Sequence, residues 1–230
     1  MRLAVGLALA LAAATASAQP SGPGGPGRGP RQSYADPSAV IAADLALSRI
    51  AREKGQWQAL RKAAAPGAVL IAPRAVDAAT WLKRQPEPVT PQRWEPRTVW
   101  MSCDGGYAVS HGVWTRGGSS GEYVAVWERQ DKGDWKWLLR EEGPAHETGE
   151  KPDMIAGKVA ECYGLTRRSR PPEDAPPLVP ANGASYDRSL RWSVAVAADC
   201  SRTITVQTWD GKALVPAFTA RREPPGSGCD

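Results

Sequence analysis

Beyond residue 35, apolar residues recur three and four positions apart, which is the spacing of one face of an α-helix. Asp36 and Pro37 are an N-cap and a first-turn residue of the kind that begins a helix, and Gly55 is a typical C-terminal stop. Two shorter helices are predicted over residues 56–65 and 77–84. The apolar stripe of the first helix consists of Val40, Ala43, Leu47, Ile50 and Ala51.

After Pro91 apolar residues alternate with polar ones, and this period of two predicts β-strands. Short turns rich in Gly and Asp separate the segments, as in antiparallel hairpins. Asp104 belongs to one of these turns, and Asp-Gly is first of all turn chemistry. The four predicted strands cover residues 92–102, 107–116, 122–130 and 135–140.

Three further strands are predicted near the C-terminus, at residues 189–197, 203–208 and 213–217, with a hairpin turn at 209–212. A short extended piece at 69–71 follows the second helix. Residues 155–162 fit a helix and a strand equally well, and the pattern does not decide between them.

Helices followed by a strand meander predict an α+β protein. We expect three N-terminal helices packed on a curved antiparallel sheet, a cone, with a C-terminal β extension. Such a cone leaves a concave, mostly apolar cavity at its mouth, where small ligands bind. The predicted divisions are an α+β domain at 35–145, an irregular connection with a proline-rich linker at 146–187, the extension at 188–220 and a tail at 221–230.

The N-terminus has the three parts of a secretory signal peptide: a basic start at Arg2, an apolar run at 3–14 and the small residues 16–18. Residues 1–18 are therefore expected to be removed before Gln19, and residues 19–34 form a Pro/Gly-rich linker. The apolar run is too short to span a bilayer, so we expect an exported protein, periplasmic or secreted, with no membrane span.

The net charge of +5 falls to +4 when Arg2 leaves with the signal peptide (5 − 1 = 4). The charge is dispersed and partly in linkers, so we expect a solvated surface and no nucleic-acid partner. Ten Trp exclude a fully disordered chain, and with a single Phe they must supply most of the aromatic volume of the core.

The four cysteines, an even number in an exported protein, predict up to two disulfides with three alternative pairings. They are Cys103, Cys162, Cys200 and Cys229. The chain has no Cys-x-x-Cys, which counts against a thioredoxin-like site or a zinc ribbon. Its two histidines, His111 and His146, come without a spaced carboxylate pair. No metal site and no cofactor are predicted.

Several runs resemble the nuclear transport factor 2-like superfamily, also called the cystatin-like α+β cone, and within it an exported subgroup of unknown function. They are Gly-Gln-Trp-Gln-Ala-Leu at 55–60, Trp-Met-Ser-Cys-Asp-Gly-Gly-Tyr-Ala-Val at 100–109, and the runs at 121–130 and 135–139. The resemblance covers residues 34–143 and implies the cone fold. Because one fold hosts many functions, it says little about activity.

Ketosteroid isomerase in this superfamily carries a catalytic carboxylate just before a proline, where this chain has Ala72 and Pro73. Its tyrosine donor falls near Ser48, whose side chain is too short to replace it. Both departures count against proton shuttling, so no catalytic residue is assigned. Residues 118–121 form a hairpin loop and not the elbow of a serine nucleophile.

Aromatic residues of the cone and one histidine are the candidates for lining its cavity. By strand alternation Tyr123, Ala125 and Trp127 share a face, and Glu128 lies on the other. The seven predicted pocket residues are Trp81, Trp100, Tyr107, His111, Tyr123, Trp127 and Trp137.

Three functional hypotheses follow. The first is a non-catalytic exported module, dimeric through its sheet, that binds a small hydrophobic molecule in the cavity. The second is an isomerase, dehydratase or cyclase in which His111 or Tyr107 is the acid or base. The third is an envelope protein-interaction module, in which the C-terminal strands extend the sheet or cover an edge; a filled cavity would favour it.

Overall fold

A computed structural model describes residues 35–144, 153–165, 181–224 and 229, and over these ranges the chain is an α+β protein, as predicted. The predicted signal peptide at 1–18 and the linker at 19–34 lie outside the described residues, as does His146.

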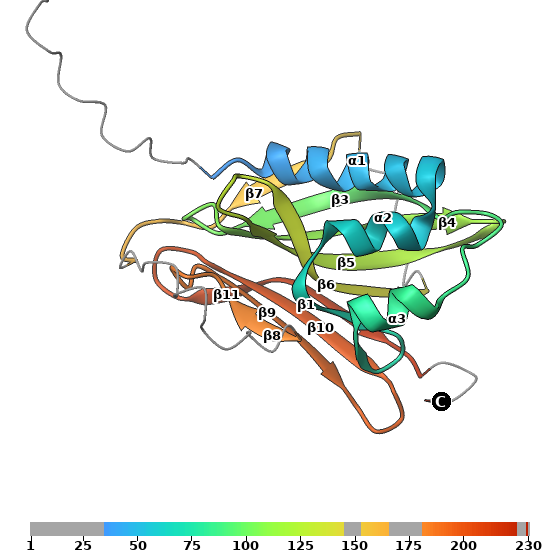
Figure 1. Ribbon diagram of the computed structural model, residues 1–230. Coiled ribbons are helices and arrows are strands. Elements are labelled where there is room, and N and C mark those ends of the chain that lie inside the picture. Colours follow the sequence, from blue (N-terminus) through green and yellow to red (C-terminus); the bar gives the residue numbers. More distant parts are fainter. Residues whose placement is uncertain (1–34, 145–152, 166–180, 225–228, 230) are drawn as a thin grey trace, which may run out of the picture. The chain divides into compact units, whose positions relative to one another are not determined.

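Three helices precede the main run of strands (Figure 1). Helix α1 (Pro37–Lys54) begins at Asp36, whose carboxylate accepts a hydrogen bond from Ser38 N at 3.0 Å. Helix α2 (Gln56–Ala63) follows directly, and α3 (Ala78–Arg84) is capped by Asp77, which accepts from Thr80 N at 2.8 Å. These caps supply acceptors for backbone N–H groups that have no partner within a helix.

The larger sheet has seven strands in the order β2-β1-β6-β5-β4-β3-β7. The prediction of a purely antiparallel sheet is wrong, because β1 pairs with β6 and β3 pairs with β7 in parallel. Each parallel pair joins strands far apart in the sequence, which no hairpin signal marks. The strands are β1 (Ala64–Ile71), β2 (Ala75–Asp77), β3 (Arg93–Met101), β4 (Tyr107–Arg116), β5 (Ser119–Arg129), β6 (Trp135–Pro144) and β7 (Ala156–Val159).

The C-terminal strands form a second, antiparallel sheet in the order β11-β10-β9-β8. It packs through apolar side chains against the face of the larger sheet opposite the helices, so it neither extends that sheet nor covers an edge (Figure 1). Its strands are β8 (Asn182–Ala184), β9 (Leu190–Val196), β10 (Arg202–Trp209) and β11 (Leu214–Arg222).

Strand β5 shows how the larger sheet separates two cores. Tyr123, Ala125 and Trp127 belong to the core under the helices, whereas Val124 and Val126 belong to the core between the sheets. Successive side chains of a strand point to opposite faces, so one strand contributes to both layers.

Two hairpin turns of the same construction join the sheets at one end. In each, an Asp accepts from a backbone N–H two residues on, Asp104 from Gly106 N at 2.8 Å and Asp187 from Ser189 N at 3.0 Å. The turns also bond each other, because Asp104 N donates to Asp187 Oδ2 at 2.8 Å and Asp187 N donates to Asp104 Oδ2 at 3.2 Å. Asp104 is thus a turn residue, as predicted.

The disulfides are Cys103–Cys162 and Cys200–Cys229. The first joins the β3–β4 turn to the segment after β7, and the second joins the β9–β10 turn to the C-terminal tail. Two disulfides fit the expectation of an oxidising compartment.

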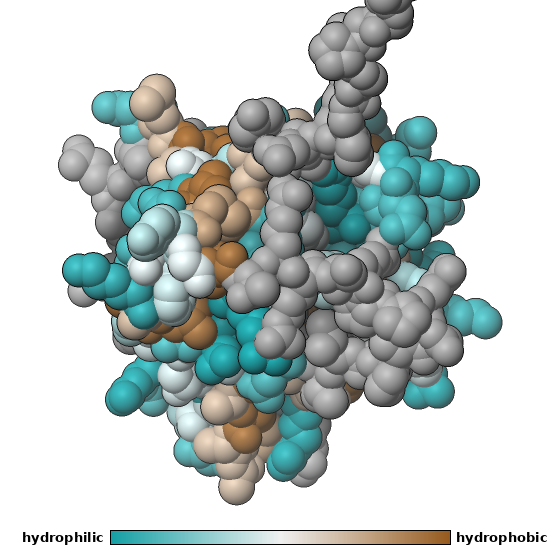
Figure 2. Space-filling view, turned by 90° about the vertical axis from the view of Figure 1, so that its left-hand side faces the viewer, coloured by the Kyte–Doolittle hydropathy of each residue, from teal (hydrophilic) through white to brown (hydrophobic). Residues whose placement is uncertain are grey.

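The surface near β7 carries exposed apolar side chains, Met154, Val159 and Tyr163. On the side toward which β3 runs, apolar patches lie between hydrophilic groups (Figure 2). Across the described part of the chain, no helix combines the length and apolar character needed to cross a membrane.

Gly112→Ala is expected to lower the free energy of unfolding by about 2 kcal/mol, because a β-carbon there would lie 2.7 Å from Pro96 Cα and 2.7 Å from the Tyr123 ring. Urea denaturation measures the change. Gly117→Asn is the control, because a β-carbon at Gly117 meets nothing within 4 Å and Asn tolerates its φ of +54°. Equal stabilities of the two variants would contradict this packing.

Candidate functional site

A buried carboxylate stands at the centre of the core under the helices. Asp44 lies on α1, is fully buried and accepts three hydrogen bonds from the sheet. Trp94 Nε1 donates to Oδ1 at 2.9 Å, and Ser110 Oγ and Tyr123 Oη donate to Oδ2 at 2.8 Å each. Three strands thereby bind one helix through a single side chain.

Arg140 completes this cluster from β6. Its guanidinium lies 4.5 Å from the ring centroids of both Trp94 and Tyr123, a cation–π arrangement on two faces. Its Nε donates to Glu142 at 2.7 Å. The positive charge of Arg140 partly compensates the buried charge of Asp44.

The chemistry open to this cluster is limited by its enclosure. Burial raises the pKa of Asp44, while Arg140 and the three hydrogen bonds oppose that rise. Burial also raises the pKa of the Tyr123 phenol, and the neighbouring Asp44 charge adds to the effect. Neither group reaches solvent, so neither can exchange a proton with a dissolved substrate in this conformation.

Sequence reasoning missed Asp44, although a signal was present. Val40, Asp44, Leu47 and Ala51 share the buried side of α1, so Asp44 is an acidic residue within an apolar stripe. A buried charged side chain is rarely tolerated without a partner. An acidic residue within the apolar stripe of a helix therefore indicates a polar partner on the element that the stripe faces.

A second set of charged groups lies between the sheets. Glu141 on β6 is fully buried, with Arg202 Nε at 3.2 Å and Arg222 Nε at 3.5 Å from its carboxylate oxygens. Arg222 Nη1 also donates to Glu122 at 2.9 Å. These ion pairs connect β5 and β6 to β10 and β11. Burial raises the pKa of Glu141, and the two arginines oppose that rise.

The seven predicted pocket residues do not surround one cavity, because they divide between the two faces of the sheet. On the helix side, Tyr123 and Trp127 are buried core residues and Trp137 donates its indole N–H to Leu60 O at 2.9 Å. Trp81 lies on α3, half-buried, edge-on to Trp57 with the ring centroids 5.5 Å apart.

The other three, Trp100, Tyr107 and His111, face the second sheet. Trp100 and Tyr107 belong to the core between the sheets, and the His111 ring lies 4.4 Å from that of Phe218. Tyr107 is buried and donates to Glu128 at 2.8 Å, and burial raises the pKa of its phenol. Strand alternation explains the division, since odd positions of β4 point away from the helices.

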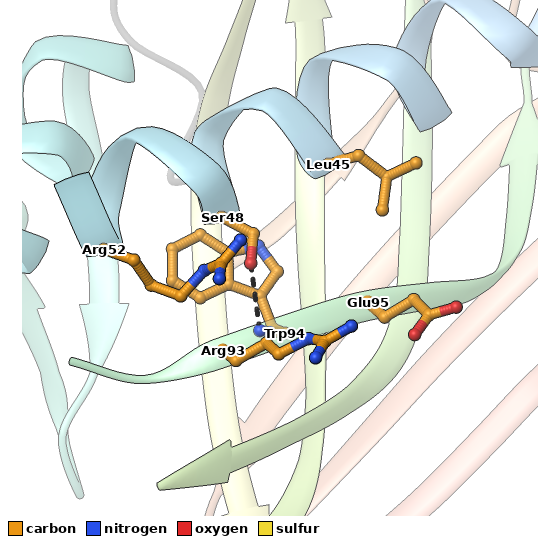
Figure 3. A pocket seen from close by; sticks show the side chains of 6 residues that line it. All are labelled: Leu45, Ser48, Arg52, Arg93, Trp94 and Glu95. Atoms are coloured by element: carbon orange, nitrogen blue, oxygen red, sulfur yellow. Dashed lines mark hydrogen bonds between the residues drawn. The ribbon is translucent and has the colours of Figure 1, made fainter. Parts of the chain in front are cut away.

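A depression of about 250 Å³ opens at the surface between α1 and the start of β3 (Figure 3). Leu45, Ser48 and Arg52 line it from the helix, and Arg93, Trp94 and Glu95 line it from the strand. Ser48 Oγ accepts from Trp94 N at 3.0 Å, as the dashed line in Figure 3 marks. Arg52 and Arg93 are exposed, and no described residue forms an ion pair with either.

Within the described ranges, no group of three or more His, Cys, Asp or Glu side chains is placed to hold a metal ion.

No family model and no curated protein matches the sequence. A solved structure of a nuclear transport factor 2 (NTF2-like) superfamily protein from Salmonella enterica subsp. enterica serovar Typhimurium str. LT2 aligns with 46% of this chain and 96% of that chain. The sequence identity is 12% and the TM-score is 0.28. A likeness this low carries no argument, so membership of the superfamily stays a prediction from the sequence runs.

Asp44→Ala is expected to lower the free energy of unfolding by about 3–5 kcal/mol, because it leaves Arg140 buried without its neighbouring charge and three donors without an acceptor. Tyr123→Phe removes one donor and should cost about 1 kcal/mol. Urea denaturation gives both values. The exposed Asp153→Ala is the control, with a change within about 0.5 kcal/mol. An Asp44→Ala protein as stable as this control would refute the network.

His111 should make stability fall as the pH drops below about 6.5. Burial, together with Arg222 and Arg97, lowers its pKa from the ordinary 6.5, and Glu122 at 3.7 Å opposes that only in part. The unfolded chain then binds a proton that the folded chain does not, at a cost of up to about 1.4 kcal/mol for each pH unit.

Urea denaturation at pH 7.0, 6.0 and 5.5 measures this slope. His111→Gln should flatten the slope by the contribution of one proton, and His146→Gln, which changes the chain's other histidine, serves as the control. The proposed titration is wrong if the wild type and His111→Gln lose stability in parallel.

Proposed function

We propose that this protein is an exported, non-catalytic binding module whose ligand binds in the surface depression between α1 and β3. In this proposal residues 1–18 are removed and the mature chain begins at Gln19. The two disulfides support an oxidising destination, periplasmic or extracellular.

The burial of the acidic and phenolic groups in the described core supports a non-catalytic role. The groups with acid or base chemistry under the helices, Asp44 and Tyr123, bond each other and are fully buried. His111 and Tyr107, the residues of the enzymatic alternative, face the second sheet. An acid or base must come within hydrogen-bond reach of its substrate, and the side chains of Asp44, Tyr123 and Tyr107 are buried among other described residues.

One observation carries the choice of site: two guanidinium groups from separate elements border the same depression, and neither is paired with a described residue. Guanidinium groups bind carboxylates and other oxyanions in bidentate fashion. Leu45, 39% exposed, adds a small apolar lip. We infer a ligand that carries an acidic group, in place of the purely apolar molecule expected from a cone cavity.

Intrinsic tryptophan fluorescence of residues 19–230 tests the proposal, because Trp94 is one of the residues that line the depression. Small carboxylates such as benzoate and galacturonate should change the emission saturably, and their neutral amides should not. Arg52→Gln and Arg93→Gln should each weaken binding about threefold to fivefold, the range of an exposed ion pair.

Arg191→Gln is the matched control. Arg191 is exposed on β9, away from the depression's lining, and its substitution removes the same charge. A response to neutral apolar compounds that survives both substitutions would place the ligand elsewhere and return the choice to an apolar cavity. If Arg191→Gln weakens binding as much as Arg52→Gln and Arg93→Gln do, the effect comes from the net charge of the protein and not from this site.

A further inference from the structure

Three surface depressions meet around one residue. Arg93 lines the depression of Figure 3, a second of about 280 Å³ and a third of about 340 Å³. The second shares Trp94 and Glu95 with the first, and it shares Thr115 with the third. We group the three depressions by these shared residues and call them the Arg93 trough, which extends from Arg52 on α1 to the β4–β5 hairpin.

The trough carries three arginines and one acid. Arg52 lies at its helix end, Arg93 at its middle and Arg116 at the hairpin end. Glu95 is the acidic residue of the lining, and it has an interaction partner of its own. A row of positive side chains favours a ligand that carries several acidic groups along its length, because each acidic group can pair with one arginine.

The remaining lining of the hairpin end consists largely of hydroxyl groups and glycine. Thr90, Thr115, Ser119 and Ser120 line the third depression together with Gly117 and Gly118. Beside either glycine a β-carbon would meet no atom within 4 Å, so the backbone there is open to a ligand. Serine and threonine hydroxyls both donate and accept, which suits the hydroxyl groups of a sugar.

The strands bordering the trough offer a peptide little main chain to pair with. On the side of β4, Arg93 pairs with Thr115. On the opposite edge of β3, which β7 pairs only at Thr98–Met101, Gln92 N donates to Gln56 and Pro96 has no N–H to offer. The N–H of Trp94 is taken by Ser48. A peptide that binds as an added strand depends on free main-chain groups at a sheet edge, whereas a glycan does not.

We propose that the Arg93 trough binds an acidic oligosaccharide, a chain of uronic-acid sugars that extends from Arg52 past Arg93 to Arg116. This rests on the proposed function, whose depression is the helix end of the trough. Recognition is by charge and hydroxyl contacts, because the Trp94 indole points into the core, where it donates to Asp44.

Isothermal titration of residues 19–230 with galacturonate and with trigalacturonate tests the proposal. Trigalacturonate should bind at least about tenfold more tightly than the monomer, because its further groups bind intramolecularly once the first is in place. Arg116→Gln should weaken trigalacturonate about threefold to fivefold and leave the monomer unchanged, whereas Arg52→Gln should weaken both. Arg191→Gln should alter neither.

The outcomes separate this inference from the proposed function. Galacturonate binding that depends on Arg52, with no effect of chain length or of Arg116→Gln, would overturn the oligosaccharide proposal. The proposed binding of a small acidic ligand in the depression would then be retained. If neither sugar binds and no small carboxylate does, both proposals are wrong. Pentaglutamate that binds as tightly as trigalacturonate, with the same dependence on Arg116, would overturn the glycan in favour of an acidic peptide. Maltotriose, a neutral trisaccharide, should not bind.

Discussion

The larger sheet has to be covered on both faces, and most of the structure follows from that requirement. Its central strand β5 is apolar on each side, with Tyr123 and Trp127 toward the helices and Val124 and Val126 away from them. A sheet of this kind is stable only between two layers. The helices supply one layer, and the C-terminal strands supply the other.

The covers are held by different means. Each disulfide closes a single sheet layer, Cys103–Cys162 beside the larger sheet and Cys200–Cys229 beside the smaller one. The contact between the sheets that the described residues show is non-covalent: apolar packing, the ion pairs of Glu141, and the paired turns of Asp104 and Asp187. Polar groups in such an interface add little net stability, but they penalise any other alignment because a shift leaves them buried and unpaired. Asp44 acts in the same way for α1.

The parts of the fold that could be predicted from the sequence are those with local signals. Asp36 before an apolar stripe marks the start of α1, and alternation with Asp-Gly turns marks β4 and β5. The parallel pairing of β1 with β6 has no local signal, since it depends on contacts between residues about 70 positions apart, such as Leu70 and Arg140. The second sheet did have a local signal in the sequence. Val124 and Val126 make the face of β5 opposite the helices apolar, and an apolar sheet face indicates that a further layer packs on it.

The candidate site was less predictable than the fold. Large aromatic residues suggested a cavity, yet with a single Phe in the chain the Trp side chains are needed to fill the cores. The depression at Arg93 depends on how α1 crosses the start of β3, a tertiary feature to which Arg52 and Arg93 contribute from 41 positions apart. Exposed arginines in a basic chain look alike in sequence, and only the packing of the helix distinguishes these two.

The closed interior and the charged rim are consequences of one arrangement. Asp44 and Arg140 are tolerable in the water-free core only while their partners stay in place, so a ligand entering between α1 and the sheet would have to break that cluster. Arg52 and Arg93 face no such cost, because their guanidinium groups are already solvated and lose little on meeting an oxyanion. The buried charge that holds the helix layer is thus the reason for proposing a binding site at the rim of this fold and not in its core.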